Sequence, residues 1–216
     1  QFLAVRVRAE GREHVRCYSI SSAPSARGYL EISVRRAGLV SGTLHATLRP
    51  GSMLSVKAPA GAFTYPAGED RPLVLIAGGV GITSMMSRLR HAIEHEPTRP
   101  VSLFYSVKSE ADIAFREELQ FLRQRHPQAK IVIAITGPIP PPDVFPGRIS
   151  DSLLARSIPN LEHASCFLCG PPPMIEAMKR LLAGLGVADA QVHHEIFNPA
   201  VAAASGSLSG ALTLLV

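Results

Sequence analysis

The sequence predicts a two-domain protein, in which an antiparallel β-barrel precedes an α/β domain built on a doubly wound parallel sheet. Two observations carry this prediction: the hydrophobic periodicity changes along the chain, and a stretch bounded by prolines at residues 66–72 separates the two patterns. Apolar residues recur at a period of two before this stretch, whereas apolar runs alternate with helical periodicity after it. We therefore place the domains at residues 1–66 and 72–198. Residues 199–216 are expected to be a linker and the start of a truncated further domain.

Short strands are expected in the first domain. Apolar and polar residues alternate at residues 3–8 and 30–35, the pattern of strands with one buried face. Glycine or proline lies between such runs, at residues 24, 28, 38, 50–51 and 61. Short strands with regular turns favour a small antiparallel barrel. The chain opens inside the first strand, so we expect the barrel to be truncated at its N-terminus.

Strands and helices are expected to alternate in the second domain. Residues 73–77 form a continuous apolar run, typical of a parallel strand buried on both faces, and apolar residues then recur at helical spacing as far as Ile93. Further strands are expected at residues 101–105, 131–135, 166–168 and 192–197, and helices at 115–122, near Leu153 and at 172–182, with Gly184 just past the last helix. This alternation predicts a parallel sheet that binds ligands at the carboxyl ends of its strands.

Composition restricts the class of protein. With 46% hydrophobic and 18% charged residues among 216, the chain can bury a substantial core, and no apolar run approaches the ~20 residues of a membrane span. No signal peptide is visible. Cys17, Cys166 and Cys169 make an odd and sparse set, which fits a reducing compartment, so we expect a cytoplasmic location.

The net charge of +5 is unevenly distributed. Residues 1–65 contain nine Lys and Arg against three Glu, a balance of +6, whereas the rest of the chain balances at −1. Such a basic region can bind a phosphorylated cofactor, an acidic protein or nucleic acid. Because no nucleic-acid-binding module is recognisable, we expect no nucleic-acid partner.

Two motifs of the first domain are suited to a diphosphate and a flat ring. In Arg16-Cys17-Tyr18-Ser19, at a strand end, the arginine can bind a diphosphate, the tyrosine offers an aromatic face and the serine can reach a ring nitrogen. In residues 38–44, glycines permit close approach, and a helix beginning near Ser41 offers free N–H groups. Taken alone, each motif is also what an ordinary strand end or a capped short helix contains.

Two motifs of the second domain lie where a dinucleotide would bind. Residues 77–83 (Ala-Gly-Gly-Val-Gly-Ile-Thr) are a glycine-rich turn from strand to helix, although they are not a G-x-G-x-x-G fingerprint. Cys169-Gly170-Pro171 lies between a buried strand and a helix, where a thiol could face a nicotinamide. Cys166 and Cys169 also suggest zinc or a redox disulfide. Zinc needs two more ligands, however, and residues three apart lie on opposite faces of a strand.

His193, His194 and Glu195 look like a metal cluster. In the expected terminal strand these side chains alternate between faces, so at most two could converge. We expect no metal site.

Together and in this order, the motifs resemble those of the ferredoxin–NADP reductase superfamily, over residues 1–198. In that family a flavin-binding barrel precedes a nucleotide-binding α/β domain. The resemblance implies an NAD(P)H-dependent flavoprotein reductase that transfers hydride from NADH or NADPH to FAD, and then electrons to a ferredoxin-type iron–sulfur carrier or an oxygenase component. The alternative is a non-catalytic, nucleotide-binding regulatory module with the same fold, against which the joint presence of Ser19, Cys169 and Glu195 counts.

The resemblance also implies roles for residues. Arg16 would bind the FAD diphosphate, Tyr18 would pack on the isoalloxazine, and Ser19 would hydrogen-bond near the reactive flavin nitrogen. The implied catalytic residues are Ser19, Cys169 and Glu195. The implied FAD site also contains Cys17, Ser33, Val34, Arg35, Val40, Ser41, Gly42, Thr43, Thr83 and Phe197, the last as the aromatic cover of the flavin. The implied NAD(P) site contains Gly79, Val80, Gly81, Thr83, Ser106, Lys108, Cys169, Gly170, Pro171 and Met174.

The preference between NADH and NADPH stays open. Ser106, Lys108 and Arg116 follow the second sheet strand, where a 2′-phosphate would fall, but a lysine there could equally be solvated surface. Ser84 stands where close relatives usually have proline. The end of the chain resembles reductases that carry a C-terminal plant-type ferredoxin domain, with residues 199–210 as a flexible linker and 211–216 as the opening strand. A 2Fe–2S cluster is then expected only in a domain missing from this chain.

Overall fold

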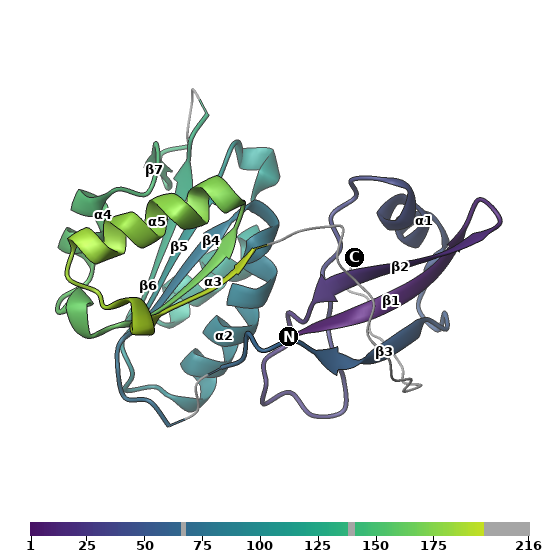
Figure 1. Cartoon of the computed structure of the whole chain (residues 1–216), viewed down its shortest axis with the longest axis horizontal. Coiled ribbons are helices and arrows are strands. Elements are labelled where there is room, and N and C mark those ends of the chain that lie inside the picture. Colours follow the sequence, from purple (N-terminus) through teal and green to yellow (C-terminus); the bar gives the residue numbers. More distant parts are fainter. Residues whose placement is uncertain (66–67, 138–140, 197–216) are drawn as a thin grey trace. The chain divides into compact units, whose positions relative to one another are not determined.

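The structure is a computed structural model that describes residues 1–65, 68–137 and 141–196 (Figure 1). These residues form two compact units, an N-terminal unit of residues 1–65 and a C-terminal unit of residues 68–196. Phe197, the expected linker and the expected final strand lie outside the described residues. None of the described helices has the length and apolar composition that a membrane span requires.

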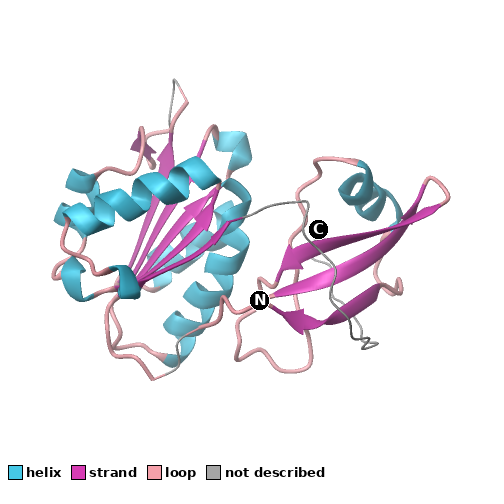
Figure 2. Ribbon diagram, in the orientation of Figure 1, coloured by secondary structure: helices cyan, strands magenta, loops and turns pink. Residues whose placement is uncertain are grey.

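A three-stranded antiparallel sheet and one helix form the N-terminal unit (Figure 2). The elements are β1 (Phe2–Ala9), β2 (Arg12–Ser19), α1 (Leu39–Thr47) and β3 (Ser55–Ala60), with the sheet order β2-β1-β3. Glu10 and Gly11 connect β1 to β2 with φ angles of 49° and 73°, the left-handed pair that closes a tight two-residue hairpin. Leu3 and Val5 alternate toward the face of β1 that packs on the core, together with Leu44 of α1.

The strand predicted at residues 30–35 is wrong. Only an isolated bridge between Ile20 and Ile32 forms there. The apolar side chains of this stretch pack on the core of the unit, which explains the alternation. Glu31 accepts one backbone hydrogen bond, from Ser21 N to its carbonyl at 2.8 Å, but its own N–H donates to the side chain of Ser22 at 3.2 Å, so no ladder continues. Among the described residues, the antiparallel part of the predicted fold is therefore a three-stranded sheet with irregular flanking chain.

A six-stranded parallel sheet with helices on both faces forms the C-terminal unit, and it confirms the predicted α/β fold (Figures 1 and 2). The strand order is β7-β6-β5-β4-β8-β9. The strands are β4 (Leu73–Gly78), β5 (Val101–Val107), β6 (Ala129–Ile135), β7 (Phe145–Pro146), β8 (Ser165–Gly170) and β9 (Val192–Ile196). The α-helices are α2 (Ile82–His95), α3 (Arg116–Arg125), α4 (Asp151–Ser157) and α5 (Pro172–Gly184), and the short 3-10 turns are η1 (Gly79–Gly81), η2 (Glu110–Asp112), η3 (Leu161–His163) and η4 (Asp189–Gln191).

Helices cover the parallel sheet on both of its faces. β4 is buried along its whole length, as the continuous apolar run predicted. Val74 and Ile76 belong to the apolar cluster that α4 and α5 cover. Helix α2 contacts β4, β5 and β8, and α3 contacts β6, so these two helices lie against the sheet as well. Side chains of β8 consequently alternate between an α5 layer and an α2 layer.

Two boundaries differ from the sequence-based expectation. Gly184 is the last residue of α5, and the glycine in the left-handed region is Gly186, with φ of 85°. Strand β7 was not predicted, because two residues are too short to show periodicity. It exists through its parallel pairing with the end of β6.

Candidate functional site

A glycine-rich turn opens the carboxyl edge of the parallel sheet. β4 ends at Gly78 and passes through η1 directly into α2. Gly79 has a φ of 53°, and a Cβ built there would meet nothing within 4 Å. The backbone at Gly79 is therefore open to close approach by a ligand, in a conformation that favours glycine. This fits the pyrophosphate or nicotinamide of a dinucleotide.

The other glycines of this edge are needed for packing. A Cβ on Gly81 would overlap the carbonyl of Cys169, and a Cβ on Gly78 would overlap the thioether of Met174. A Cβ on Gly170 would lie 3.1 Å from Met174 Sδ and 3.2 Å from the Cα of Gly78. The structure thus brings residues of β4, β8 and α5 together, although they are far apart in sequence. The backbones of β4 and β8 approach each other and Met174 so closely that both Gly78 and Gly170 must lack a side chain.

Helix α5 offers few amide donors at this edge. Residues 171, 172 and 173 are all proline, so the N-cap and first two helical positions of α5 have no N–H. Met174, also of the predicted site, lies in the first turn of α5 and is partly buried. In α2, Thr83 is 5% exposed, and its Oγ1 donates to the carbonyl of Val80 at 3.1 Å. An anionic ligand is therefore better suited to η1, where the helical segment begins, than to the start of α5.

Cys169 lies at the centre of this edge as a neutral thiol. It is in register with Ala77 on β4 and with the partly exposed Glu195 on β9. Burial raises the pKa of the Cys169 thiol to about 11; the charge of Glu195 acts in the same direction, and a side-chain hydrogen bond with Ser84 opposes it. Near pH 7 the thiol stays protonated, which is unsuited to a covalent nucleophile. Cys166 instead belongs to the apolar cluster under α5, where burial raises its pKa to about 12.

The candidate 2′-phosphate residues follow β5. Ser106 pairs in register with Gly78 of β4, and Lys108 is exposed just beyond the end of β5. Arg116, at the start of α3, forms an ion pair with Glu110 of η2 and lies 3.8 Å from Asp143 Oδ1. The guanidinium of Arg116 is therefore already occupied by two carboxylates.

The motif at the end of β2 presents its side chains on two faces. Arg16 and Tyr18 lie opposite Val5 and Leu3, on the core side of the sheet, whereas Cys17 and Ser19 point the other way. Arg16 is exposed, and Tyr18 is partly buried against the core. Burial raises the pKa of Tyr18, with the charge of Arg16 opposing it. Ser19 ends the strand and is 9% exposed.

Helix α1 presents an open N-terminal end. Its first helical hydrogen bond runs from Gly42 N to Gly38 O at 2.7 Å, so the amides of residues 39, 40 and 41 precede it. Ser41 Oγ accepts from the amides of Ala37 and Gly38 at 2.9 and 3.1 Å. A Cβ on Gly38 or Gly42 would meet nothing within 4 Å, and Arg35 just before the helix is exposed. These features fit a diphosphate.

The side chains of two predicted flavin residues have other partners at this helix end. Val40 is 6% exposed, with its side chain in the core of the N-terminal unit. Thr43 Oγ1 donates to Leu39 O at 2.9 Å, along the helix itself. A ligand at α1 would therefore bind the amide of Val40 rather than its side chain.

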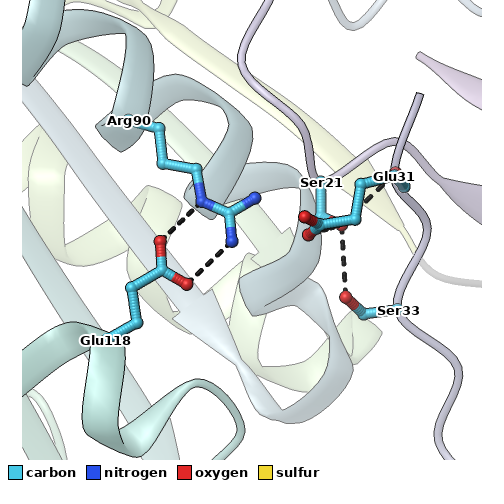
Figure 3. A network of polar contacts seen from close by, with 5 residues as sticks. All are labelled: Ser21, Glu31, Ser33, Arg90 and Glu118. Atoms are coloured by element: carbon cyan, nitrogen blue, oxygen red, sulfur yellow. Dashed lines mark hydrogen bonds and ion pairs between the residues drawn. The ribbon is translucent and has the colours of Figure 1, made fainter. Parts of the chain in front are cut away.

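Serines surround a buried carboxylate that the sequence did not reveal (Figure 3). Glu31 is 6% exposed and accepts from Ser21 Oγ at 2.7 Å, and Ser21 Oγ lies 3.2 Å from Ser33 Oγ. The carbonyl of Val34, the residue after Ser33, lies 2.7 Å from His45 Nε2, at hydrogen-bond distance. The alternation of residues 30–35 had predicted Glu31 on a solvent face. The Ser21-Ser22 pair, ten residues earlier in the sequence, is the signal that could have indicated polar partners for Glu31.

Arg90 holds α2 against α3 within the C-terminal unit (Figure 3). Its Nε and Nη2 donate to the two carboxylate oxygens of Glu118 at 2.6 and 2.7 Å. The guanidinium also lies 5.6 Å from the ring centroid of Phe115. A bidentate pair of this kind stabilises the position of the helix whose first turn forms the candidate site.

Comparison with known proteins assigns a cofactor to each unit. The family profile "Oxidoreductase FAD-binding domain" matches residues 1–65, and "Oxidoreductase NAD-binding domain" matches residues 75–180. Curated relatives are flavohemoproteins: that of Oceanobacillus iheyensis is 35% identical over 92% of this chain and 51% of its own length, and that of Pseudomonas putida is 37% identical over 94% and 51%. The chain thus spans about half the length of these relatives.

Solved structures agree with this assignment. The FAD/NAD-binding domain of nitric oxide dioxygenase from Vibrio cholerae superposes with a TM-score of 0.81 at 32% identity, covering 92% of this chain and 84% of that one. A ferredoxin NADP+ reductase from Neisseria gonorrhoeae with bound FAD and NADP shares the fold, with a TM-score of 0.72 at 22% identity, over 91% and 85%.

Proposed function

Because the chain belongs to the ferredoxin–NADP reductase superfamily, as an NAD(P)H-dependent flavoprotein reductase, we propose that it passes electrons from NADH or NADPH through FAD to a one-electron metal acceptor. The observation that carries this proposal is the meeting of Gly79, Cys169 and Gly170 at one edge of the parallel sheet. A bound flavin supplies the chemistry, since it accepts electrons as a hydride and releases them singly.

In the N-terminal unit, we assign the FAD diphosphate to the first turn of α1 and to Arg16. The amides of residues 39–41 supply directional donors, and Arg16 supplies an exposed guanidinium. Tyr18 offers its ring to the isoalloxazine, and its raised pKa keeps its hydroxyl protonated. Ser19, at the end of β2, supplies a hydroxyl for a ring nitrogen.

In the C-terminal unit, we assign the dinucleotide to η1, the first turn of α2 and the end of β8. Gly79 permits close approach of the pyrophosphate, and Thr83 lies in the first turn. The Cys169 thiol is neutral, so it presents a polarisable surface to the nicotinamide without adding a negative charge. Glu195, which lies in register with Cys169 on the adjacent strand β9, supplies the carboxylate of the proposed catalytic set.

Two kinds of acceptor are supported. The first is a ferredoxin-type carrier or an oxygenase component, because residues 1–65 have a balance of +6 and the related structures include the ferredoxin reductase in carbazole 1,9a-dioxygenase. The second is a haem, because the curated relatives are flavohemoproteins and are about twice as long as the matched region. A 2Fe–2S domain after residue 198 belongs to the first proposal.

The reduced thiols of Cys17, Cys166 and Cys169 support a reducing, cytoplasmic setting.

Anaerobic stopped-flow reduction tests the proposal. The purified, FAD-loaded protein is mixed with NADH or NADPH, and loss of the flavin absorbance is followed. The reduced protein is then mixed with a plant-type ferredoxin or with a single-domain haemoglobin. We expect flavin reduction and one-electron transfer to one of the two acceptors. A protein that binds nucleotide but neither retains FAD nor bleaches would instead be the regulatory module.

A further inference from the structure

We propose that Glu31 is a positioning residue of the FAD site, which through Ser21 leaves the hydroxyl oxygen of Ser33 as an acceptor for a donor group of FAD. This inference rests on the proposed function, because Ser33 is one of the residues expected to bind FAD. No role of Glu31 follows from the motifs of the N-terminal unit, which lie before and after it in the sequence. Its carboxylate is nevertheless buried, and its N–H, its carbonyl and its side chain all have partners in the same unit.

Glu31 joins two segments that contain expected FAD residues. Its carbonyl accepts from Ser21 N at 2.8 Å, and its N–H donates to Ser22 Oγ at 3.2 Å. These two serines follow the end of β2, where Ser19 lies, whereas Ser33 is two residues after Glu31. The contacts of Glu31 therefore fix Ser33 relative to the end of β2, in a described stretch where the only strand pairing is an isolated bridge.

The carboxylate determines the direction of a chain of hydrogen bonds (Figure 3). Ser21 Oγ lies 2.7 Å from Glu31 Oε1, and because a carboxylate only accepts, Ser21 is the donor. A serine hydroxyl has a single hydrogen, so Ser33 Oγ, 3.2 Å from Ser21 Oγ, is the donor of the second hydrogen bond. The hydrogen of Ser33 is thus directed to Ser21, and its oxygen offers only lone pairs to a ligand.

Helix α1 holds the residue that follows Ser33. His45 Nε2 lies 2.7 Å from the carbonyl of Val34, and because a carbonyl only accepts, the imidazole is the donor. Ser33 is partly buried and lies in sequence between Glu31 and Val34, which are both held by side chains. These contacts leave Ser33 little freedom to change its position.

An oxygen that only accepts is suited to some parts of FAD and not to others. Phosphate oxygens are themselves acceptors, so the hydroxyl of Ser33 is unsuited to the diphosphate, which we assign to α1 and Arg16. The flavin portion of FAD has two kinds of donor, namely the N3–H of the isoalloxazine and the hydroxyls of the ribityl chain. We therefore expect one of these groups to donate to Ser33.

A double-mutant cycle separates positioning from a merely structural role. Isothermal titration of the apoprotein with FAD is compared for the wild type, Ser21→Ala, Ser33→Ala and the double variant. We expect Ser33→Ala to weaken binding about three- to tenfold, the range of one lost hydrogen bond, and Ser21→Ala at least about twofold. The double variant should bind no more weakly than Ser33→Ala, since Ser21 acts through Ser33. Ser52→Ala is the control, because Ser52 Oγ also accepts from a backbone amide of this unit, that of Arg49.

Substitutions of Glu31 distinguish its oxygen from its bulk. Glu31→Leu removes the acceptor and should weaken FAD binding as much as Ser21→Ala does. Glu31→Gln keeps a carboxamide oxygen for Ser21 and should bind FAD within about twofold of the wild type, because the neutral hydrogen bond is retained. Equal weakening by both substitutions would overturn the role of Glu31. If Glu31→Leu does not fold, the cycle of Ser21 and Ser33 decides the question.

Analogues of FAD identify the donor that Ser33 binds. One analogue has a methyl group on N3 of the isoalloxazine, and the others each lack one ribityl hydroxyl. The wild type should bind one of them about three- to tenfold more weakly than FAD, and Ser33→Ala should bind that analogue and FAD equally. If the wild type binds all of them as tightly as FAD, or if Ser33→Ala discriminates by the same factor, Ser33 is not the acceptor.

The carboxyl ¹³C resonance of Glu31 gives a readout that does not depend on FAD. The resonance is identified by its loss in Glu31→Gln, and it should shift in Ser21→Ala, where the donor is missing, but not in Ser52→Ala. An unshifted resonance, or equal weakening of FAD binding by Ser21→Ala with and without the Ser33 hydroxyl, would overturn the assignment of Glu31. Failure of the wild-type protein to bind FAD would overturn the proposed function and leave the resonance as the test of the Glu31 contact.

Discussion

The two units offer their cofactors different kinds of surface. The C-terminal unit presents an edge of tightly packed backbone, where glycines on β4 and β8 and the neutral thiol of Cys169 form the proposed nucleotide site, with Glu195 as the neighbouring charge. The N-terminal unit presents charge and open donors, namely Arg16 and the first turn of α1, on a sheet of only three strands. Packing therefore determines the nucleotide site and electrostatics the flavin site. Substitutions should fail for different reasons in the two units.

The largest effect is expected at Gly81. In Gly81→Ala, the new methyl group would overlap the Cys169 carbonyl, so η1 or β8 must shift. We expect flavin reduction by NADH to fall at least about a hundredfold, because a displacement near 1 Å at a reacting centre has that cost. FAD content should stay normal, since the FAD contacts proposed for Arg16 and α1 lie in the N-terminal unit. Stopped-flow reduction and flavin quantitation check both statements.

Gly184 provides the matched control. It is also a glycine of the C-terminal unit, at the end of α5, but a Cβ built there would meet nothing within 4 Å. Gly184→Ala should leave reduction unchanged. If Gly81→Ala also reduced flavin at the wild-type rate, the carboxyl edge formed by β4, η1 and β8 would not be the nucleotide-binding site.

The second effect is loss of flavin from the N-terminal unit. Arg16→Ala removes a charge-assisted contact, which should weaken FAD binding about ten- to hundredfold. Arg12→Ala is the control, because Arg12 is exposed on the same strand and the same face. Isothermal titration of the apoprotein with FAD gives the affinities. Full affinity in Arg16→Ala would remove Arg16 from the site and leave the α1 amides as the only proposed diphosphate ligands.

The contrast between the units also explains what could be predicted from sequence. Buried parallel strands have continuous apolar runs, so β4, β5, β6 and β8 were all located, and their carboxyl ends then located the glycine and cysteine motifs. The N-terminal unit buries polar groups through side-chain hydrogen bonds, which leave no periodic signal. Glu31 therefore looked like a solvent-facing strand residue, although Ser21 and Ser22 hold it inside.

Pairwise contacts between distant residues were the least predictable. Nothing in the local sequence of Arg90, for example, indicates that Glu118 of α3 is its partner. The structure also changes the role that two predicted side chains can have. Val40 can serve a ligand only through its amide, and Arg116 is engaged by carboxylates instead of awaiting a phosphate.

Ionic strength should separate the two half-reactions. Arg6, Arg8, Arg12, Arg27 and Arg49 are exposed on the N-terminal unit and are not required for the proposed FAD contacts. Salt screens such charges over about 8–10 Å, so transfer to an acidic ferredoxin should slow about tenfold from low to physiological ionic strength, and flavin reduction much less. Stopped-flow traces of each half-reaction across a salt series provide the comparison. Equal sensitivity of both steps would contradict a docking role for this basic surface.

The smallest effect is expected on the choice of nucleotide. Glu110 and Asp143 both engage Arg116, so little positive charge beyond Lys108 is left for a 2′-phosphate after β5, and we predict that the protein prefers NADH. Glu110→Gln should partly release Arg116 and raise kcat/KM for NADPH relative to NADH about two- to fivefold, the range of an exposed ion pair. Glu117→Gln is the control, because Glu117 is an exposed carboxylate one residue after Arg116. An equal gain in both variants would mean that general charge, and not the release of Arg116, governs the preference. A wild-type preference for NADPH would show that Ser106 and Lys108 suffice for the phosphate.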